Sequence, residues 1–330
     1  MIWQRHKYHR NNMLIYNKNK ISINPFKSVL VTCVAIIMLS AIDANAQLTN
    51  IQSAFFQNQY LVNPAMAGME NALNLNMDYH QQWLGVPGSP RLTTFTADYN
   101  SGNKVGLGLN IYNDEAGLIN RTRVMGTYAY HITLNDKGDK VNFGLSIGLN
   151  DAYINYSSIV GDPGDLAIPE FNKHGLYADG DLGVAYTSTK FNAQIAIPNL
   201  KRVLFKSALD DVDVEASTFY AAMSYKIQLS NDFNYSVFTI EPKMVYRGIT
   251  GYNNILDVGF NLYRDTFEDT YRLNVTGIYH SDNSATFGAG FDIHNFGLLV
   301  SYTYNTGPLS TYANNTFELG INVKLKKKSL

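Results

Sequence analysis

The stretch "KVNFGLSIGLN", residues 140–150, decides the fold of this chain. Successive side chains of a β-strand point to opposite faces of the sheet. One face here is entirely apolar and carries Val141, Phe143, Leu145, Ile147 and Leu149. The opposite face carries Asn142, Gly144, Ser146, Gly148 and Asn150. The stretches "KVGLGLNI" (104–111) and "TFELGINVKL" (316–325) repeat the pattern, so its period of two predicts strands with one apolar and one polar face.

The composition of the 330-residue chain favours strands over helices. It contains 23 Tyr and 17 Phe, and its 25 Gly outnumber its 9 Pro. Aromatic residues are enriched in strands. Only 16% of the residues are charged and the formal net charge is −1, so the basic surface typical of nucleic-acid-binding proteins is missing. We expect no nucleic-acid partner.

Residues 1–46 have the organisation of a signal peptide with an extended basic region. Lys and Arg occur up to Lys27, an apolar run extends from Val29 to Ile42, and Ala44 and Ala46 occupy the small-residue positions of a cleavage site. Cys33, the only cysteine of the chain, lies in the apolar run, so no disulfide framework is expected. We expect residues 47–71 to form a periplasmic segment, 72–326 the folded domain and 327–330 a basic tail.

The lengths of the connections indicate how the strands are arranged. Fourteen strands are expected, at residues 72–83, 89–100, 104–115, 119–134, 140–154, 178–189, 191–200, 216–229, 233–248, 252–265, 270–281, 284–294, 296–306 and 316–326. Twelve strands result if the pairs divided at Lys190 and Asn295 are each read as one. The long connections, 155–177, 201–215 and 307–315, are all odd-numbered, whereas the even-numbered ones are short. This asymmetry is typical of outer-membrane barrels, which have short periplasmic turns and longer extracellular loops.

The expected fold is therefore an all-β, antiparallel, up-and-down transmembrane barrel in a Gram-negative outer membrane. Closure is required in lipid, because an open sheet edge would leave backbone groups unpaired at several kcal/mol each. Tyrosines near the strand ends are expected to form aromatic girdles at the two interfaces. These are Tyr79, Tyr99, Tyr128, Tyr130, Tyr225, Tyr246, Tyr263, Tyr279, Tyr302 and Tyr304. The small inward residues leave a lumen that could hold water or a plug.

Motifs that could carry chemistry have structural explanations. "GLSIG" (144–148) matches the nucleophile elbow of hydrolases, but that motif needs a strand-to-helix turn and Ser146 lies in mid-strand. Asp162 and Asp165 lack the spacing of a calcium loop. The histidines are scattered, without the paired spacing of a metal site. We expect no enzyme activity, no cofactor and no metal.

One loop has the composition of a docking surface. Residues 201–215 combine basic and acidic side chains with an apolar centre, and Arg202, Phe205, Asp210 and Asp211 are the candidate contacts. A charged, solvated loop explains the same residues. The alternative is a surface for a protein partner, favoured by the apolar residues within it.

The stretch "QNQYLVNPAMAG" (57–68) resembles the N-terminal signature of the PorP/SprF family of outer-membrane proteins, which are associated with type IX secretion in Bacteroidetes. The family's Asn-Pro-Ala-x-Ala-Gly turn corresponds to Asn63, Pro64, Ala65, Ala67 and Gly68, with Met66 where Tyr is usual. Further similar stretches follow in order. They are "QQWLGVPGSP" (81–90) with Gln82, Trp83, Gly88 and Pro90, "GLGLNIYNDEAG" (106–117) with Asp114 and Gly117, "YAYHI" (128–132), and "IEPKMVYR" (240–247) with Glu241 and Pro242.

The resemblance implies a non-enzymatic part in type IX secretion. Its partners would be other components of that machine, including the periplasmic ring, or a large secreted or surface-attached cargo protein such as a gliding adhesin. We expect the turn at residues 63–68 to lie at or within the periplasmic mouth and to plug or brace the barrel, with Pro64 fixing the backbone and Asn63 capping the turn. A channel for small solutes is the alternative function.

Overall fold

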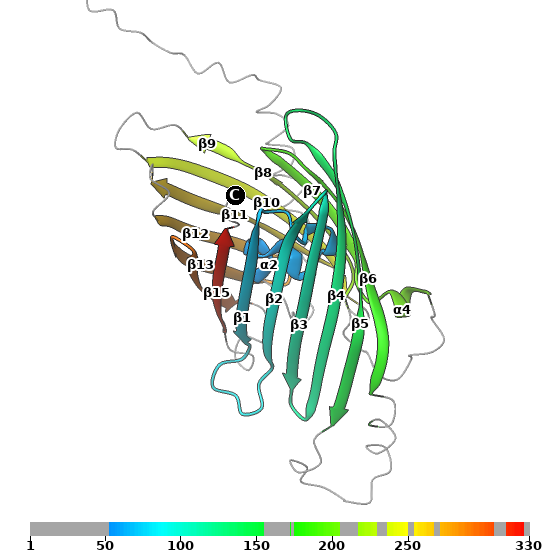
Figure 1. The fold of residues 1–330 in the computed structure, drawn as a ribbon. Helices are drawn as coiled ribbons and strands as arrows, with labels where there is room; N and C mark the ends of the chain where they lie inside the picture. The colour runs from blue at the N-terminus through cyan, green and yellow to red at the C-terminus, as the bar shows by residue number, and fades with distance from the viewer. Residues whose placement is uncertain are drawn as a thin grey trace, which may run out of the picture. The chain divides into compact units, whose positions relative to one another are not determined.

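The computed structural model describes residues 53–154, 172, 175–204, 217–229, 236–249, 254–266, 271–306 and 315–326. Its strands form one antiparallel sheet (Figure 1). They are β1 (Ala72–Gln81), β2 (Arg91–Gly102), β3 (Val105–Ala116), β4 (Ile119–Thr133), β5 (Lys140–Ile154), β6 (Leu176–Thr187), β7 (Phe191–Ile197), β8 (Ser217–Tyr225), β9 (Ile227–Leu229), β10 (Ser236–Ile249), β11 (Ile255–Thr266), β12 (Tyr271–His280), β13 (Ser284–Ile293), β14 (Phe296–Asn305) and β15 (Thr316–Lys326). β8 and β9 are two pieces of one span, because both pair with β10 on either side of Lys226. The fourteen predicted spans are confirmed.

The sheet closes on itself between its first and last strands. β1 pairs with β15 along its whole length, from Ala72 opposite Lys326 to Gln81 opposite Phe317. Every other strand pairs with its neighbours in chain order around the ring. Closure satisfies the backbone hydrogen bonds that a bilayer cannot supply. No helix within the described part of the chain is long and apolar enough to cross a membrane, a finding that does not concern strands.

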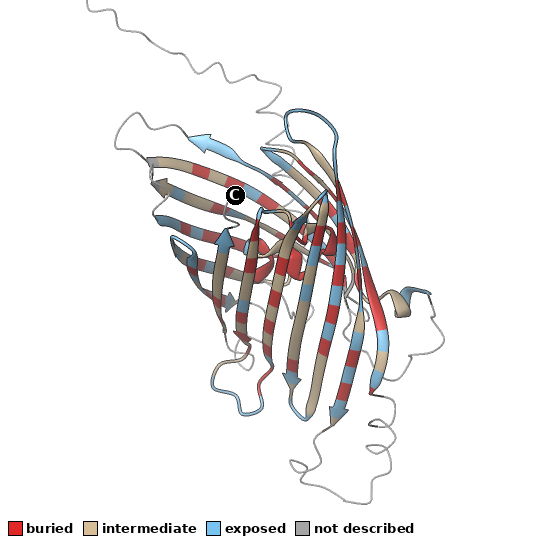
Figure 2. Cartoon of the chain, viewed as in Figure 1, coloured by how far each residue is buried: buried red, intermediate tan, exposed pale blue. Residues whose placement is uncertain are grey.

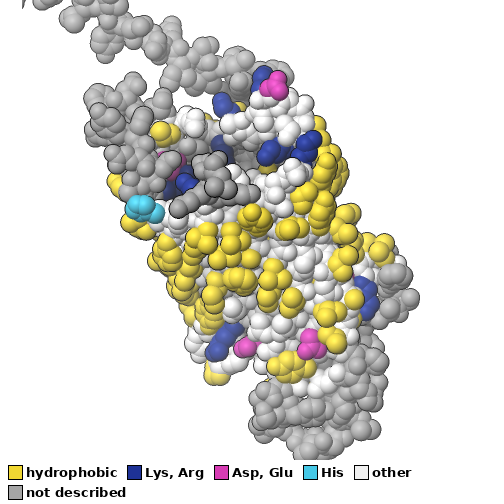
Figure 3. Space-filling model, in the orientation of Figure 1, with side chains coloured by type: hydrophobic (Ala, Val, Ile, Leu, Met, Phe, Trp, Pro, Cys, Tyr) yellow, Lys and Arg dark blue, Asp and Glu magenta, His cyan; other side chains and the backbone are white. Residues whose placement is uncertain are grey.

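The side-chain alternation is that of an inside-out protein. In β5, Ile147 is 64% exposed on the outer surface, whereas Asn142 on the inner face is fully buried. Figure 2 shows this alternation of buried and exposed residues along the strands. Apolar side chains gather on the outer face of the barrel, and charged side chains lie toward its two ends (Figure 3). This distribution matches a lipid-facing belt.

The prediction of an interfacial girdle position is wrong for one of the tyrosines. Tyr263 of β11 points into the lumen, where its hydroxyl donates to Glu241 at 3.2 Å. Seven of the others are exposed on the barrel: Tyr128, Tyr130, Tyr225, Tyr246, Tyr279, Tyr302 and Tyr304. Tyr263 shares its face of the strand with Asn261, so the period of two assigns it to the interior.

The two ends of the barrel differ. Short connections, such as Asn103–Lys104 and 188–190, join strands at the end that also holds the start of β1 and the end of β15. We call this the short-turn end. At the other end, which we call the long-loop end, β1, β5 and β7 finish and β2, β6 and β8 begin, so the longer connections join strands there. By the rule for outer-membrane barrels, we expect the short-turn end to face the periplasm.

The segment before β1 lies inside the barrel. It contains α2 (Ala54–Gln57) and two short 3₁₀ helices, η1 (Gln59–Leu61) and η2 (Pro64–Met66). Figure 1 shows this blue segment crossing the interior behind β1 and β2. We call residues 53–69 the plug. Most of the plug is buried, including Phe55, Phe56, Ala65 and Ala67, and the barrel's interior therefore contains a packed core.

Candidate functional site: a plugged lumen

Side chains around most of the barrel wall hold the plug by hydrogen bonds. The two faces of the plug are tied to strands far apart in sequence, which fixes its position across the lumen. The contacts are Ser53 Oγ with Ser301 Oγ (2.6 Å), Gln57 Nε2 to Thr276 Oγ1 (3.2 Å), Asn58 Nδ2 to Thr96 Oγ1 (2.7 Å), Tyr60 hydroxyl to Thr127 Oγ1 (2.8 Å), Asn110 Nδ2 to the Leu61 carbonyl (3.0 Å) and Asn192 Nδ2 to Gln59 Oε1 (2.7 Å). Ser53 Oγ also donates to Glu318.

The Asn-Pro-Ala turn is one of the most fully buried parts of the plug. Asn63 Oδ1 accepts a hydrogen bond from the Ala65 backbone N–H at 3.0 Å, which caps η2, and Pro64 occupies the first helical position, where no donor is needed. Asn63 Nδ2 donates to Gln194 Oε1 of β7 at 2.9 Å. The cap therefore also fastens the turn to the wall.

Glycines of the wall let the turn lie directly against the sheet. An added Cβ at Gly144 would collide with the backbone of Pro64, and one at Gly183 with the side chain of Asn63. Gly106 and Gly108 make similarly close approaches, to the Ala67 carbonyl and to the Tyr60 hydroxyl. The polar face of β3, β5 and β6 is glycine-rich where the plug touches it. These glycines provide the space that the plug fills.

The end of the turn is held by backbone contacts. Gly68 has a φ of +67°, a conformation that favours glycine, and its N–H donates to Asp98 Oδ2 at 2.9 Å. Its carbonyl accepts from Asn100 Nδ2 at 2.7 Å. The Ala67 carbonyl lies 3.0 Å from Nε2 of His131. The predicted turn is thus enclosed by the short-turn halves of β2 to β4.

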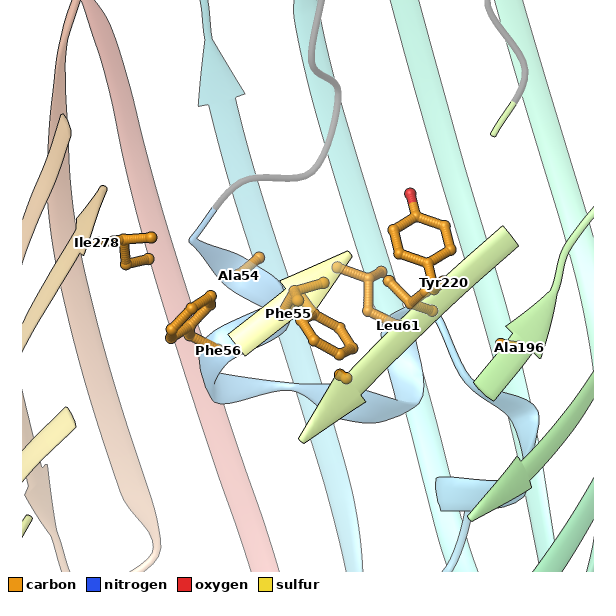
Figure 4. Packing of buried hydrophobic residues seen from close by; sticks show 10 residues of the cluster. Ala54, Phe55, Phe56, Leu61, Ala196, Tyr220 and Ile278 are labelled. Carbon is orange, nitrogen blue, oxygen red and sulfur yellow. The ribbon is translucent and has the colours of Figure 1, made fainter. Parts of the chain in front are cut away.

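The opposite side of the plug is apolar. Phe55, Phe56 and Leu61 pack with Tyr220 and Ile278 of the wall, and Ala54, Val62, Ala196, Ala222 and Val245 complete the cluster. Figure 4 shows the labelled members projecting from the plug and from surrounding strands. The rings of Phe55 and Tyr220 are 6.4 Å apart. Apolar burial of this kind stabilises the plugged state.

A buried lysine ties this apolar side to the wall. Lys243 Nζ of β10 donates to the Phe56 carbonyl at 2.8 Å and lies 3.7 Å from Glu241 Oε1. Glu241 also accepts from Ser224 Oγ at 2.7 Å and from Tyr263. The signature residue Glu241 thus neutralises the lysine that binds the plug. Its neighbour Pro242 lies on the outward face of β10, where it is exposed.

The "GLSIG" motif contributes to the same interface. All five residues lie within β5, and Ser146 Oγ is 2.7 Å from Thr127 Oγ1, which in turn accepts from the Tyr60 hydroxyl. Burial raises the pKa of Tyr60, so the phenol remains a proton donor to Thr127 at physiological pH. Ser146 is part of a packed polar contact.

A hydroxyl, an imidazole and a carboxylate line up elsewhere in the lumen. His280 Nε2 is 2.8 Å from Thr286 Oγ1, and its Nδ1 is 2.6 Å from Asp257 Oδ1. Arg247 Nε donates to the other oxygen of Asp257 at 2.9 Å. His280 and Thr286 have no solvent exposure. A nucleophile needs space for its substrate, so this network serves to join β10 to β13.

The signature residues of the 82–90 loop meet at the long-loop end. The Gln82 N–H donates to the Pro90 carbonyl at 2.9 Å, and the Gly117 N–H donates to the Gly88 carbonyl at 3.2 Å. Trp83, Gly88 and Gly117 have positive φ values of 49°, 71° and 62°. The hydrogen bond between Gly117 and Gly88 therefore joins the loop to the β3–β4 turn. Asp114 is buried near the end of β3, three residues before Gly117.

The predicted docking loop is not tested by the structure. Phe205, Asp210 and Asp211 lie outside the described residues, as do Asp162 and Asp165, and the side chain of Arg202 is likewise undescribed. The helix α4 (Leu200–Leu204) precedes them and exposes Leu204. Among the residues that the structure describes, no group of three or more His, Cys, Asp or Glu is arranged to hold a metal ion.

On the short-turn side of the plug, the barrel contains a cavity of about 650 Å³. We call it the vestibule. Its base is formed by plug residues, including Phe56, Gln57 and Met66, and its sides by the short-turn halves of the strands. Sequence reasoning missed the vestibule and the plug residues 53–62. The available signal was a group of apolar residues in a short segment that has no other hydrophobic core to join: Phe55, Phe56 and Leu61.

Comparison with solved structures gives distant likenesses. The CymD monoaromatic hydrocarbon channel has a TM-score of 0.48 at 12% identity, covering 86% of this chain and 95% of that one. The P. putida toluene transporter TodX has 0.46 at 11%, covering 83% and 95%. The Acinetobacter baumannii outer-membrane protein Omp33 has 0.39 at 8%, covering 78% and 99%. No curated protein sequence matches the chain.

A family model provides the assignment. The model described as "Type IX secretion system membrane protein PorP/SprF" matches residues 44–323, which include the plug and nearly the whole barrel. The turn at 63–68 and the clasped 82–90 loop both lie within the matched range. The chain therefore belongs to the PorP/SprF family of type IX secretion system membrane proteins and is an outer-membrane β-barrel.

Proposed function

We propose that this barrel is a closed, non-enzymatic binding component of the type IX secretion system, which supports the export or surface attachment of protein cargo. Its partners would be periplasmic components of the machine or one class of large cargo protein. The observation that carries the proposal is the plug, anchored to wall residues on β2, β4, β12 and β14. A lumen filled in this way favours a scaffold over a conduit.

The packing of the plug argues against easy displacement. Its glycine contacts leave no room between the turn and the wall, and Phe56 and Ala65 are almost completely inaccessible. Removing it would expose the apolar cluster and leave Lys243 and Glu241 without their covering chain. A small-solute channel, the alternative, would need that displacement during each passage. The tightly packed plug therefore favours partner binding at the two ends of the barrel.

A clean deletion of the gene, with quantitative proteomics of the medium and of the cell surface, tests the proposal. Selective loss of one or a few large proteins would support a dedicated role in cargo attachment. Loss of all type IX cargo would support a role as a core component bound to the periplasmic ring. An unchanged secretome would contradict both roles and favour the solute channel. Complementation with the wild-type gene is the control.

A further inference from the structure

The strand formed by β8 and β9 extends beyond its neighbour at the short-turn end. The two pieces pair with β10 in one continuous register, which is interrupted opposite Pro242 because proline has no N–H to donate. On the other side, β7 begins only at Phe191, opposite Tyr225. Within the described part of the chain, β9 therefore has a strand partner on one side alone.

Backbone groups of Gln228 face the open side of β9. The Lys226 N–H donates to the Lys190 carbonyl at 2.7 Å, across the start of β7. Residues two apart on a strand direct their N–H and C=O groups to the same side, so those of Gln228 also point away from β10. The β6–β7 turn has already folded back at this level, where the Ser188 N–H donates to the Phe191 carbonyl. An edge of this kind is a template for another strand.

The two faces of this edge differ in chemistry. Ile227 and Leu229 are exposed on the outer face, by 42% and 49%. Lys226 and Gln228 lie on the inner face and line the vestibule, as does Lys190 in the turn. Since cross-strand neighbours on one face contact each other, an added strand matches both faces when polar and apolar side chains alternate along it.

The inner face of the edge has an excess of positive charge. Lys190 and Lys226 are exposed, and neither forms an ion pair within the described residues. Lys226 is opposite Glu241 in the register, but that carboxylate is already 3.7 Å from Lys243 Nζ. Three lysines thus share one glutamate. Opposite charges on neighbouring strands attract, so the inward side chains of an added strand are expected to be acidic.

We propose that the edge of β9 binds an extended segment of a periplasmic protein, which adds as a strand in line with β7 and alternates acidic with aliphatic side chains. The acidic side chains lie beside Lys190 and Lys226, and the aliphatic ones continue the outer face formed by Ile227 and Leu229. Backbone pairing supplies affinity and the alternation supplies specificity. The inference rests on the proposed function, to which it adds the place of binding and the chemistry of the partner.

The first test uses the full-length barrel in detergent and three fluorescently labelled peptides, TVEVEVT, TEEVVVT and TVKVKVT. The second peptide has the composition of the first without its alternation, and the third reverses its charge. Fluorescence anisotropy at low salt measures the binding. We expect TVEVEVT to bind several-fold more tightly than either of the others. Equal binding of TVEVEVT and either control peptide would overturn the proposal.

Backbone methylation separates strand addition from charge attraction alone. Directly opposite residues of an antiparallel pair place their side chains on the same face, so the residue that exchanges hydrogen bonds with Gln228 is one of the glutamates. N-methylation of both glutamates should weaken the binding of TVEVEVT by about tenfold. N-methylation of two valines, whose N–H groups face away from β9, is the control and should leave the affinity unchanged. Equal effects of the two methylations would refute strand addition.

A charge reversal in the barrel makes the test independent of folding. In Lys190→Glu/Lys226→Glu the preference is expected to switch from TVEVEVT to TVKVKVT, by about tenfold, and an unfolded barrel could not switch. Lys104→Glu/Lys137→Glu, in exposed turns at the same end but outside the vestibule, is the matched control and should keep the wild-type preference. A switch in the control, or none in the reversed variant, would show that the binding site is wrong.

The two proposals can fail separately. A strain that loses its cargo on deletion of the gene, while the purified barrel shows no preference among the peptides, would retain the proposed function and refute the edge of β9 as its docking site. A clear peptide preference together with an unchanged secretome would support the binding site and contradict the proposed function.

Discussion

The side-chain amide of Asn63 donates to Oε1 of Gln194 at 2.9 Å, joining the plug to a strand 131 residues further along the chain. The same side chain accepts the Ala65 N–H with its oxygen. One residue thus shapes the turn and fastens it to β7. Both of its functions would be lost in Asn63→Ala, which leaves Gln194 and the Ala65 N–H buried without these partners.

We expect Asn63→Ala to lower the free energy of unfolding by about 2–4 kcal/mol, combining the loss of a helix cap with a buried unpaired amide. Thermal unfolding of the purified barrel, followed by its mobility on unboiled gels, measures the change. Gln228→Ala, an exposed position at the short-turn end, is the control and should change stability by less than about 0.5 kcal/mol. Equal stability of the two variants would show that the cap is dispensable.

Glycine-to-alanine substitutions in the wall should have opposite signs at two positions. Gly144→Ala forces a methyl group into the Pro64 backbone and should destabilise the plugged barrel by about 1–3 kcal/mol. Gly126→Ala, on the outward face of β4, meets only the Ile147 carbonyl at 3.8 Å and should stabilise the strand by about 0.5 kcal/mol. The same unfolding assay, with proteolysis of the N-terminal segment as a second readout, compares them. Protease resistance of Gly144→Ala equal to that of the wild type would refute the close contact.

Removing residues 53–69 should open the barrel. In planar bilayers we expect the wild-type protein to show no steady conductance and the deletion to show discrete, ion-dependent openings, because the plug crosses the lumen (Figure 1). Folding of the deletion is checked by its gel mobility without boiling. Steady conductance of the wild type would contradict a closed scaffold and support the channel.

The buried pair Lys243 and Glu241 should behave as a coupled unit. Lys243→Met alone leaves the buried Glu241 carboxylate without its cation, and we expect a loss of about 3 kcal/mol in the free energy of unfolding. Adding Glu241→Gln should restore about half of that loss, because no uncompensated charge remains. Additive losses in the double variant would show that the two residues act separately. A double-mutant cycle in thermal unfolding supplies the numbers.

The strand pattern was predictable because the two faces of a barrel wall have different surroundings. Every second residue faces lipid and the others face the lumen, so alternation marks each span, as in β5, where the predicted and observed bounds agree. Which plug residues each inward side chain reaches was not predictable. Period two places Asn142 and Lys243 on the inner face alike, yet cannot say that Lys243 reaches Phe56. Tyr263 was misassigned because tyrosine suits both an interface and a polar interior.

The family resemblance led us to expect the turn at the periplasmic mouth, but nothing in the sequence indicated which wall residues it contacts. Gly144 and Gly183 read as ordinary small residues of a polar face, and only the closed ring brings both onto residues 63–64. Their relation arises from the ring and leaves no local signal.

The plug also constrains the order in which the molecule assembles. Its contacts reach β2 through Asn58 and β14 through Ser53, strands from opposite ends of the chain. The seam between β1 and β15 is therefore the last place through which residues 53–69 can enter from the side. We expect the segment to take its position before that seam closes, so that the nascent sheet forms around it. Contacts between such distant parts of a chain form slowly, so the final step of membrane insertion should be the wrapping of the wall around its own amino-terminal segment.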